Sequence, residues 1–554
     1  MCKEHDKHGV GGTMKNLKTI LPVVAWSIQL AASAAAMLNI WRLNMIPDVY
    51  LWILGGLLLC LLVLTALLAF LPGKKGKTKA LMIRQIIACV LILAITAGCV
   101  VAGSAAARIR RTISSITAPP ITGGIVAVYV LDKNAATALT DLDNAVFGIA
   151  EDFDDPGTQR MIGEIEAILG HSITCKVFPS VPAMVEGLYL KEVPAIIMNS
   201  AYASVLEDTE VFEDFDQRVK ILYESAENGP LENTEPSGTT APPETTVPPE
   251  TTLPPETTEP ATEPTEEAQG SEPTEPSIPD VELTEGGITT KPFIVYISGS
   301  DLRTNYLTAS RSDVNILMAV NPVTKQVLMI NTPRDFYVPN PAGNGAMDKL
   351  THCGVYGIEC SVEALENFYN IEIDYYAQVN FVGFERLIDA VGGVTVYSDE
   401  AFVTRHGAYQ IVQGYNEMNG NKALCFARER YALLAGDNAR GKNQMKVLKA
   451  VIEKMETGVA IANYTEILES LQGMINASLS ADDLAQLVKM QLTDMAQWEI
   501  ASYAVAGSGA YAETYSMPGY QLYVINPHEQ KVNYAKTLLG MLKAGETLPD
   551  TVKK

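Results

Sequence analysis

The chain has little basic charge and lacks the residue spacings that hold zinc. It carries 41 Lys and Arg against 64 Asp and Glu, a formal net charge of −23 over 554 residues. A general nucleic-acid binder needs basic surface to displace counterions from phosphates, so this balance argues against that class and leaves room only for a local basic site. None of the eight cysteines stands in a CxxC or Cys/His spacing typical of zinc. Cys353 and Cys360 could form a disulfide, and two free buried thiols are the alternative.

Three long apolar runs lie within the first 105 residues. They lie at Thr19–Ile40, Val49–Leu71 and Ile86–Ala105, and about 20 apolar residues suffice for a helix to cross the hydrocarbon core. We therefore predict an N-terminus at 1–18 and three transmembrane helices within 19–105. A cleaved signal peptide would be one shorter run, and a buried hydrophobic hairpin in a soluble protein is the other alternative.

Basic residues beside these runs predict the orientation. Four lysines precede the first run, and four more lie between the second and third runs, at 74–79. Because basic residues favour the cytoplasmic side, the N-terminus and this loop are expected inside, and everything after residue 106 outside. Arg108, Arg110 and Arg111 oppose this assignment. The prediction is a multi-pass protein of the cell membrane whose C-terminal domains are extracellular.

Two soluble domains are expected, separated by a linker. Strand-like runs at Ile125–Leu131, Ile173–Phe178 and Ala195–Met198 predict a small accessory α/β domain over 124–226. Residues 227–288 are rich in Pro, Thr and Glu, with a PPETT unit repeating every six residues from Pro242. Such a segment buries too little apolar surface to fold and is expected to be extended. We interpret it as a spacer that lets the second domain reach into a wall, and a linker with no tuned length is the alternative.

Residues 290–554 are expected to form an α/β catalytic domain, an α/β/α-like sandwich with a mixed central sheet, because strand and helix patterns alternate. Val314–Val320 and Gln326–Asn331 are predicted to be strands joined by a tight turn, after a buried strand at Phe293–Ser298. The later predicted elements are a helix at Phe381–Val391, a strand at Ala423–Arg430, and a helix from Ala439 to Met455 capped by Asn438 or Asp437.

The predicted hairpin brings charged residues together. If its strands pair about the turn, Asp313 at the start of one lies near Arg334 at the end of the other. Asp301 reaches the same sheet edge if the first strand runs parallel to the third, and open α/β sheets build sites at such edges.

Arginines recur near these positions in a chain that is otherwise acidic: Arg303, Arg311, Arg334, Arg405, Arg428, Arg430 and Arg440. Guanidinium groups bind phosphate oxygens in pairs, and carboxylates beside them can hold Mg²⁺, which fits a pyrophosphate with a bound divalent ion. On the predicted strand and helix, Arg428 shares a face with Arg430, and Arg440 with Gln444. The alternative is a set of structural ion pairs, Asp301 with Arg303 and Asp313 with Arg311 or Arg334.

At these residues the chain resembles the LytR-CpsA-Psr family, over about residues 290–455. The matching segments, in order, are SGSDLR, SRSD, TPRD, MDKLTHCGVYG, FVGFERLIDAVGGV, MNGNKALCFARER and GDNARGKNQ. Each segment is weakly specific alone, whereas their number and order make the match strong. The anchor and the preceding domain are similar to the capsule-type branch of that family.

The resemblance implies a phosphotransferase that moves a glycopolymer, such as a teichoic acid or a capsular polysaccharide, from undecaprenyl pyrophosphate to peptidoglycan. The product would be a phosphodiester at the 6-hydroxyl of N-acetylmuramic acid, and an apolar pocket between sheet and helices would take the polyprenyl tail. Asp301 and Asp313 would ligate Mg²⁺ (or Mn²⁺). The remaining site residues implied are Arg311 and Arg334 as catalytic groups, with Arg303, Lys349, Arg428, Arg430, Arg440 and Gln444 binding substrate.

One departure and two histidines qualify this assignment. Many members carry arginine where this chain has Asn443, and Lys442 is the nearest substitute for that charge. We interpret His352 and His406 as surface or loop residues and expect an aspartate or the metal to activate the acceptor hydroxyl, with a histidine base as the alternative. Two other functions remain open: a hydrolase of polyprenyl pyrophosphate, and a non-catalytic cell-envelope regulator that attenuates transcription.

Overall fold

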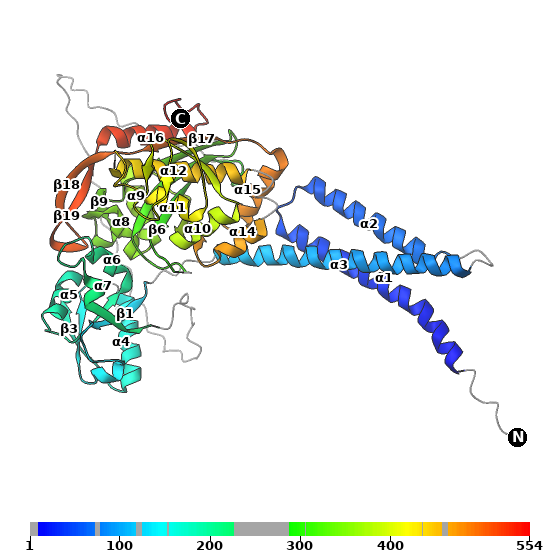
Figure 1. Cartoon of the computed structure of the whole chain (residues 1–554), viewed down its shortest axis with the longest axis horizontal. Helices are drawn as coiled ribbons and strands as arrows, with labels where there is room; N and C mark the ends of the chain where they lie inside the picture. The colour runs from blue at the N-terminus through cyan, green and yellow to red at the C-terminus, as the bar shows by residue number, and fades with distance from the viewer. Residues whose placement is uncertain are drawn as a thin grey trace, which may run out of the picture.

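The computed structural model describes residues 9–72, 78–117, 124–151, 155–225, 287–304, 306–434, 436–456 and 464–553. Nearly all of the predicted linker at 227–288 lies outside these residues. In Figure 1 three long helices project from one side of two soluble domains. We keep the names of the predicted domains and call residues 124–225 the first soluble domain and residues 287–553 the catalytic domain.

Three N-terminal helices are long and apolar enough to cross a membrane, within the described residues. They are α1 (Gly9–Leu43), α2 (Asp48–Phe70) and α3 (Thr78–Ile116). A Cβ on Gly103 of α3 would lie 3.1 Å from the Cα of Ala36 of α1, so small residues allow these helices to approach closely. Polar side chains also join the helices, since the Thr65 hydroxyl donates to Oε1 of Gln29 at 3.1 Å.

The first soluble domain is a five-stranded mixed sheet in the order β3-β2-β4-β1-β5. One face of the sheet packs in an apolar cluster with Met161 and Ile165 of α4. The other face packs in a second cluster with Met184 and Leu188 of α5, so helices cover both faces. The three strands predicted in this region are present as β1, β3 and β4. The element bounds are β1 (Val126–Leu131), β2 (Val146–Ala150), α4 (Asp155–Leu169), β3 (Thr174–Phe178), α5 (Val181–Tyr189), β4 (Ala195–Asn199), α6 (Ala203–Leu206), α7 (Phe215–Arg218) and β5 (Val219–Glu224).

The catalytic domain is built on a six-stranded mixed sheet in the order β16-β11-β6-β7-β8-β17. Its bounds are β6 (Phe293–Ser300), β7 (Ser312–Asn321), β8 (Gln326–Asn331), β11 (Tyr375–Asn380), β16 (Ile475–Ala477) and β17 (Glu499–Ala504). Both β6 and β8 pair antiparallel with β7, so they run parallel to each other, as the site prediction required.

Alternation along β6 explains why helices cover both faces of this sheet. Ile294 and Tyr296 belong to one apolar cluster, whereas Phe293 and Val295 belong to another, because successive side chains on a strand point to opposite faces. The first face is covered by α8 (Leu350–Cys353), α9 (Ile358–Tyr369) and α16 (Glu529–Lys543). The second face lies beneath α10 (Phe381–Ala390), α11 (Gly420–Arg428), α12 (Gly436–Met455), α14 (Tyr464–Leu471) and α15 (Ala481–Asp494). The predicted layered α/β architecture with a mixed central sheet is thus present.

Three antiparallel ribbons complete the domain. They pair β9 (Tyr337–Asn340) with β10 (Ala346–Lys349), β12 (Val394–Ser398) with β15 (Gly414–Met418), and β18 (Gly507–Thr514) with β19 (Met517–Pro527). A shorter pair joins β13 (Phe402–Val403) to β14 (Gln410–Ile411).

The catalytic domain packs against both of its neighbours. Ile113 and Ile116 of α3 join the apolar cluster of Phe293, and Lys489 pairs with Asp48 of α2 at 3.0 Å. The first soluble domain shares a second cluster with Met517 of β19. The catalytic domain thus lies against the apolar helices in this structure (Figure 1). The predicted spacer falls almost entirely outside the described residues, so its role stays a prediction.

Two local predictions fail. Residues 420–428 form α11 and not the predicted strand at Ala423–Arg430, because the Asn419 side chain caps a helix by accepting from the Lys422 N–H. A short apolar run fits a buried strand or a buried helix equally well by pattern alone. The next helix, α12, begins at Gly436 and so contains both residues predicted to cap it.

Candidate active site

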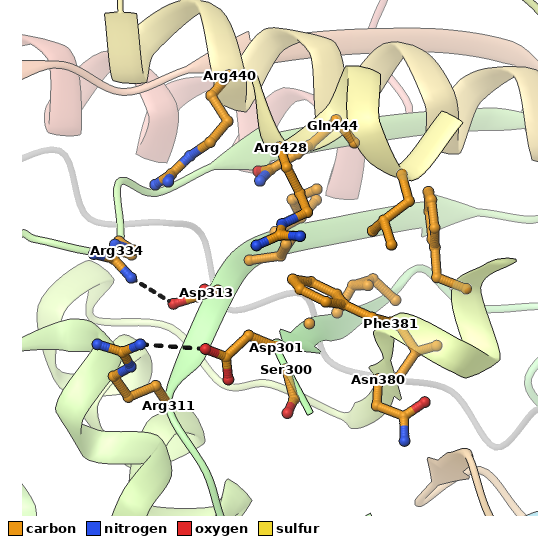
Figure 2. A pocket seen from close by; sticks show the side chains of 18 of the residues that line it. Ser300, Asp301, Arg311, Asp313, Arg334, Asn380, Phe381, Arg428, Arg440 and Gln444 are labelled. Carbon is orange, nitrogen blue, oxygen red and sulfur yellow. Dashed lines mark hydrogen bonds and ion pairs between the residues drawn. The ribbon is translucent and has the colours of Figure 1, made fainter. Parts of the chain in front are cut away.

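A cavity of about 630 Å³ lies between the second face of the sheet and helices α10, α11 and α12. Apolar side chains make up one part of its wall, among them Ile316, Val379, Leu387, Leu424 and Val451. Charged side chains gather in another part, where Figure 2 shows Arg311, Arg334 and Arg440 around two aspartates. The cavity is therefore amphipathic, with an apolar section that continues into a charged one.

The charged part is centred on the ends of β6, β7 and β8. Nη1 of Arg334 lies 2.7 Å from Oδ1 of Asp313, and Nη2 of Arg311 lies 3.2 Å from Oδ2 of Asp301. The predicted approach of Asp313 to Arg334 is confirmed. Asp301 pairs with Arg311 rather than with Arg303, the partner considered from the sequence. The three motifs that contain these residues thus meet at one rim (Figure 2).

The two aspartates differ in proton affinity because their surroundings differ. Burial raises the pKa of Asp301, and the negative charge of Asp313 raises it further. Burial acts in the same direction on Asp313, but Arg334 and Arg311 outweigh it and hold its pKa below the ordinary value. Asp301 is consequently the more basic carboxylate of the pair.

Glu429 organises the arginines at the neighbouring wall without neutralising them. Its carboxylate accepts the backbone N–H of Arg405 at 2.5 Å and of Arg430 at 3.1 Å, and also binds the N–H groups of Tyr431 and Ala432. Arg405 and Arg430 stack on the Tyr431 ring, 4.3 and 4.6 Å from its centre. Within the described part of the chain, neither guanidinium has a carboxylate within ion-pair distance.

Two further guanidinium groups lie over the ring of Phe381. Arg428 and Arg303 lie 4.4 and 5.6 Å from the centre of its ring, where cation–π attraction holds them. Neither forms an ion pair with any residue that the structure describes. Burial lowers the pKa of Arg428, and the like charge of Arg303 lowers it further. This wall therefore concentrates positive charge that the described chain does not neutralise.

Helix α12 supplies Arg440 and Gln444, and both line the cavity as their spacing predicted. The helix lies close to β8, since a Cβ on Gly441 would be 2.2 Å from Oδ1 of Asn331. Nδ2 of Asn331 lies 3.4 Å from Oε1 of Gln444. Asn443 is buried and Lys442 is exposed, and Lys442 is absent from the described cavity wall, so it does not replace the charge that Asn443 lacks.

The comparison with known proteins decides the family. A model of the LytR_cpsA_psr family matches residues 256–541, which is more than half of the chain. The chain belongs to the LytR_cpsA_psr family.

Several curated members of the LytR_cpsA_psr family are similar to this chain. The polyisoprenyl-teichoic acid–peptidoglycan teichoic acid transferase TagU of Bacillus cereus is 33% identical over 201 residues, which cover 36% of this chain and 64% of that protein. TagU of Oceanobacillus iheyensis is 38% identical over 185 residues, 32% of this chain and 57% of that protein. Among solved structures, TagV of B. subtilis is 26% identical with a TM-score of 0.39, covering 47% of this chain and 99% of that one. The chain thus spans less than two thirds of these TagU proteins.

Eight of the ten site residues that the family motifs implied line the cavity, and two do not. Arg303 lies outside the described wall on the face of Phe381. Lys349 is buried behind the wall, where its Nζ lies 2.6 Å from Oδ2 of Asp208. The eight in the wall are Asp301, Asp313, Arg311, Arg334, Arg428, Arg430, Arg440 and Gln444.

Asn380 and Asp208 are among the polar residues of the wall that sequence reasoning missed. Asn380 caps α10 by accepting from the Gly383 N–H, and its Nδ2 donates to the carbonyls of Thr304 and Tyr306, which fixes the loop after Asp301. Its place just before a predicted helix was a usable signal. Asp208 comes from the first soluble domain, and its 103-residue separation from Arg311 left no local signal.

The two histidines and the two central cysteines are also placed. His352 is fully buried, so its interpretation as a surface residue is wrong; its Nδ1 lies 2.7 Å from Oδ1 of Asp348. His406 is exposed in the loop between β13 and β14, as expected, and borders the cavity. Cys353 and Cys360 are free thiols in this structure, which rejects the disulfide alternative.

Proposed function

We propose that this protein transfers a glycopolymer phosphate from a polyprenyl pyrophosphate carrier to peptidoglycan and leaves a phosphodiester in the wall. The observation that carries the proposal is the cavity, whose apolar section leads to charged side chains. Among these, the guanidinium groups of Arg405, Arg428 and Arg430 form no ion pair with a carboxylate of the described residues. A polyprenyl tail matches the apolar section, and a pyrophosphate matches the arginines. The names of the curated relatives, which are transferases of teichoic acid to peptidoglycan, support this reading.

In this reaction the acceptor hydroxyl attacks the phosphorus that bears the glycopolymer. A new oxygen–phosphorus bond forms, the anhydride bond of the pyrophosphate breaks, and polyprenyl phosphate leaves. Arg428 and Arg430 bind the pyrophosphate oxygens, and Arg311 and Arg334 stabilise the charge that develops at the transferring phosphorus. One carboxylate of the Asp301–Asp313 pair takes the hydroxyl proton.

Asp301 and Asp313 are also the residues that would hold Mg²⁺ (or Mn²⁺). Each has one carboxylate oxygen on an arginine and a second for which the structure gives no arginine contact. In the described part of the chain no three acids, histidines or cysteines gather as a metal cage. Mg²⁺ is usually bound by one or two carboxylates together with substrate phosphates and waters, so this pair fits. Bound there, the ion would supply positive charge opposite the pyrophosphate.

The proposed setting is the outer face of a cell membrane. The short loop at 44–47 and the end of α3 both contact the catalytic domain, since Met45 and Ile113 share its apolar cluster. An odd number of spans puts that loop and the soluble domains on one side, and the lysines beside the other helix ends favour the opposite, cytoplasmic side.

An assay with labelled lipid-linked polymer and purified peptidoglycan tests the reaction. Transfer gives labelled wall and polyprenyl phosphate, and both should be lost in Arg334→Ala. Free polymer without wall-linked label would instead establish the hydrolase. Full biological activity of Arg334→Ala and Asp301→Ala in cells would favour the non-catalytic regulator.

The orientation is tested separately in intact cells. A cysteine placed in the repeat at 242–258 should react with a thiol reagent that does not cross membranes. A cysteine placed in the loop at 74–77 is the matched control and should react only after the cells are opened. The reverse pattern contradicts the proposed topology.

A further inference from the structure

One carboxylate of the first soluble domain, that of Asp208, binds charged side chains of the catalytic domain. Asp208 follows α6, and its Oδ1 lies 3.0 Å from Nη1 of Arg311 while its Oδ2 lies 2.6 Å from Nζ of Lys349. Nε2 of His352 lies 3.4 Å from the same Oδ2. Only 10% of the Asp208 side chain is exposed, so these contacts are shielded from water and strong for charge-assisted hydrogen bonds.

Arg311 is consequently held between two domains. One terminal nitrogen binds Asp208 and the other binds Asp301, which follows β6. A guanidinium fixed at both ends presents its remaining surface in one orientation. Lys349 is fixed by Asp208 as well, because its other carboxylate neighbour, Asp335, lies 3.6 Å away.

We propose that Asp208 is a positioning residue of the transferase site, supplied by the first soluble domain, which holds Arg311 in place for the pyrophosphate and is itself held from behind by Lys349. This inference rests on the proposed function. It gives the first soluble domain a role in catalysis rather than one in spacing or in binding elsewhere.

The contact between the domains is firm enough to hold the carboxylate. Met517 and Leu522 of β19 pack into the same apolar cluster as Phe212 of the first soluble domain. The hydroxyl of Tyr202 donates to the carbonyl of Ser516 in the buried interface, and the Tyr520 hydroxyl donates to Glu186. The position of Asp208 is therefore set by the apolar interface between the two domains as well as by its own ion pairs.

Autoinhibition is the competing interpretation, in which Asp208 occupies the place of a phosphate. The burial of Lys349 argues against it. Its side chain is 5% exposed and lies outside the described cavity wall. A phosphate entering the cavity would therefore not take over the Lys349 contact, and Asp208 stabilises a group behind the wall that the substrate does not reach.

The test uses the full chain in detergent with labelled lipid-linked polymer and peptidoglycan. Asp208→Asn keeps the shape and removes the charge, and we expect kcat/KM to fall by about tenfold or more. Tyr520→Phe removes a hydrogen bond across the same interface without touching Arg311, and should leave kcat/KM unchanged. In an Arg311→Ala background, Asp208→Asn should have little further effect, because the residue acts through Arg311.

Three results would overturn the inference while the proposed function stands: unchanged activity of Asp208→Asn, increased activity as autoinhibition requires, or an effect that is fully additive with Arg311→Ala. A crystal structure of Asp208→Asn gives a readout besides activity. Arg311 and Lys349 should leave their present positions, and their retention would also reject the inference. If Asp208→Asn does not fold, Asp208→Glu replaces it in both measurements, with the same expected direction.

Failure of the proposed function appears differently, as a wild-type protein that forms no wall-linked product. Binding of geranyl pyrophosphate, measured by isothermal titration, then separates the two statements. Weaker binding to Asp208→Asn than to the wild type supports a positioning role at a pyrophosphate site. Equal binding rejects it.

Discussion

The guanidinium of Arg334 and the carboxylate of Asp313 lie 2.7 Å apart, with 13% and 19% of their side chains exposed. They stand at adjacent strand ends, after β8 and at the start of β7. A pair this buried fixes the charged rim of the cavity, because each member would be costly to leave alone.

Removal of one member should therefore destabilise the protein more than removal of both. Arg334→Ala leaves Asp313 buried without its main counter-charge, and we expect a loss of about 3 kcal/mol of unfolding free energy. Chemical denaturation of Arg334→Ala, Asp313→Ala and the double variant measures the coupling. Strictly additive losses would contradict a direct interaction.

Arg428 should behave in the opposite way. Burial and Arg303 lower its pKa, so its charge is less favourable in the folded protein than in the unfolded chain. Arg428→Met is expected to keep or raise the thermal midpoint while transfer activity falls by about tenfold or more. Lys442→Met, an exposed change on α12, is the matched control and should alter neither. A less stable Arg428→Met would show that this side chain serves the fold.

His352 predicts a pH dependence of stability. Burial acts to lower its pKa, but Asp348 and Asp208 outweigh it and raise the pKa above the ordinary value. The stabilisation is therefore complete below the unfolded pKa of about 6.5 and is lost as pH rises through the higher folded value. The gap in thermal midpoint between the wild type and His352→Gln should shrink from pH 6 to pH 9. A gap that widens toward high pH would have the wrong sign.

Gly441 predicts a coupled loss of stability and activity. An added methyl would lie 2.2 Å from Oδ1 of Asn331, which forces α12 away from β8 and moves Arg440 and Gln444. Gly441→Ala should lower both the denaturation midpoint and the transfer rate. Gly540→Ala on α16 is the control, since the added methyl would meet no atom within 4 Å. Replacing glycine by alanine inside a helix should raise the free energy of unfolding by about 0.5–1 kcal/mol.

Metal removal provides a further test of the rim. We expect a chelator to abolish transfer, and Mg²⁺ or Mn²⁺ to restore it. Asp301→Asn should raise the half-saturating Mg²⁺ concentration by about tenfold or more. Asp399→Asn is the control, because it removes only the exposed pair with Lys446. Full activity in the chelator would remove the metal from the proposal.

The rim was predictable because its geometry is local. Residues 322–325 form a tight turn, so the pairing of β7 with β8 follows from the chain itself and brings Asp313 to Arg334. The course of α11 was not predictable in this way. Its buried run, Ala423–Ala427, suits a strand as well as a helix, and the Asn419 cap was the signal that distinguished them.

Contacts between domains were beyond the reach of sequence patterns. Asp208 meets Arg311 only because two apolar surfaces, each ordinary in sequence, pack against one another. The burial of His352 has the same origin, since it sits between Asp348 and that incoming carboxylate. The hydrophobic periodicity within either segment does not predict this contact.

Helix α3 runs for 39 residues from the apolar anchor to the underside of the catalytic domain. At 1.5 Å per residue it is a rod of about 58 Å, roughly half of which exceeds the thickness of a hydrocarbon core. One residue inserted before Ile109 would lift the catalytic domain by about 1.5 Å and swing it by about 100° around the rod. The length of α3 therefore sets both the distance of the cavity from the apolar helices and its direction around the helix axis.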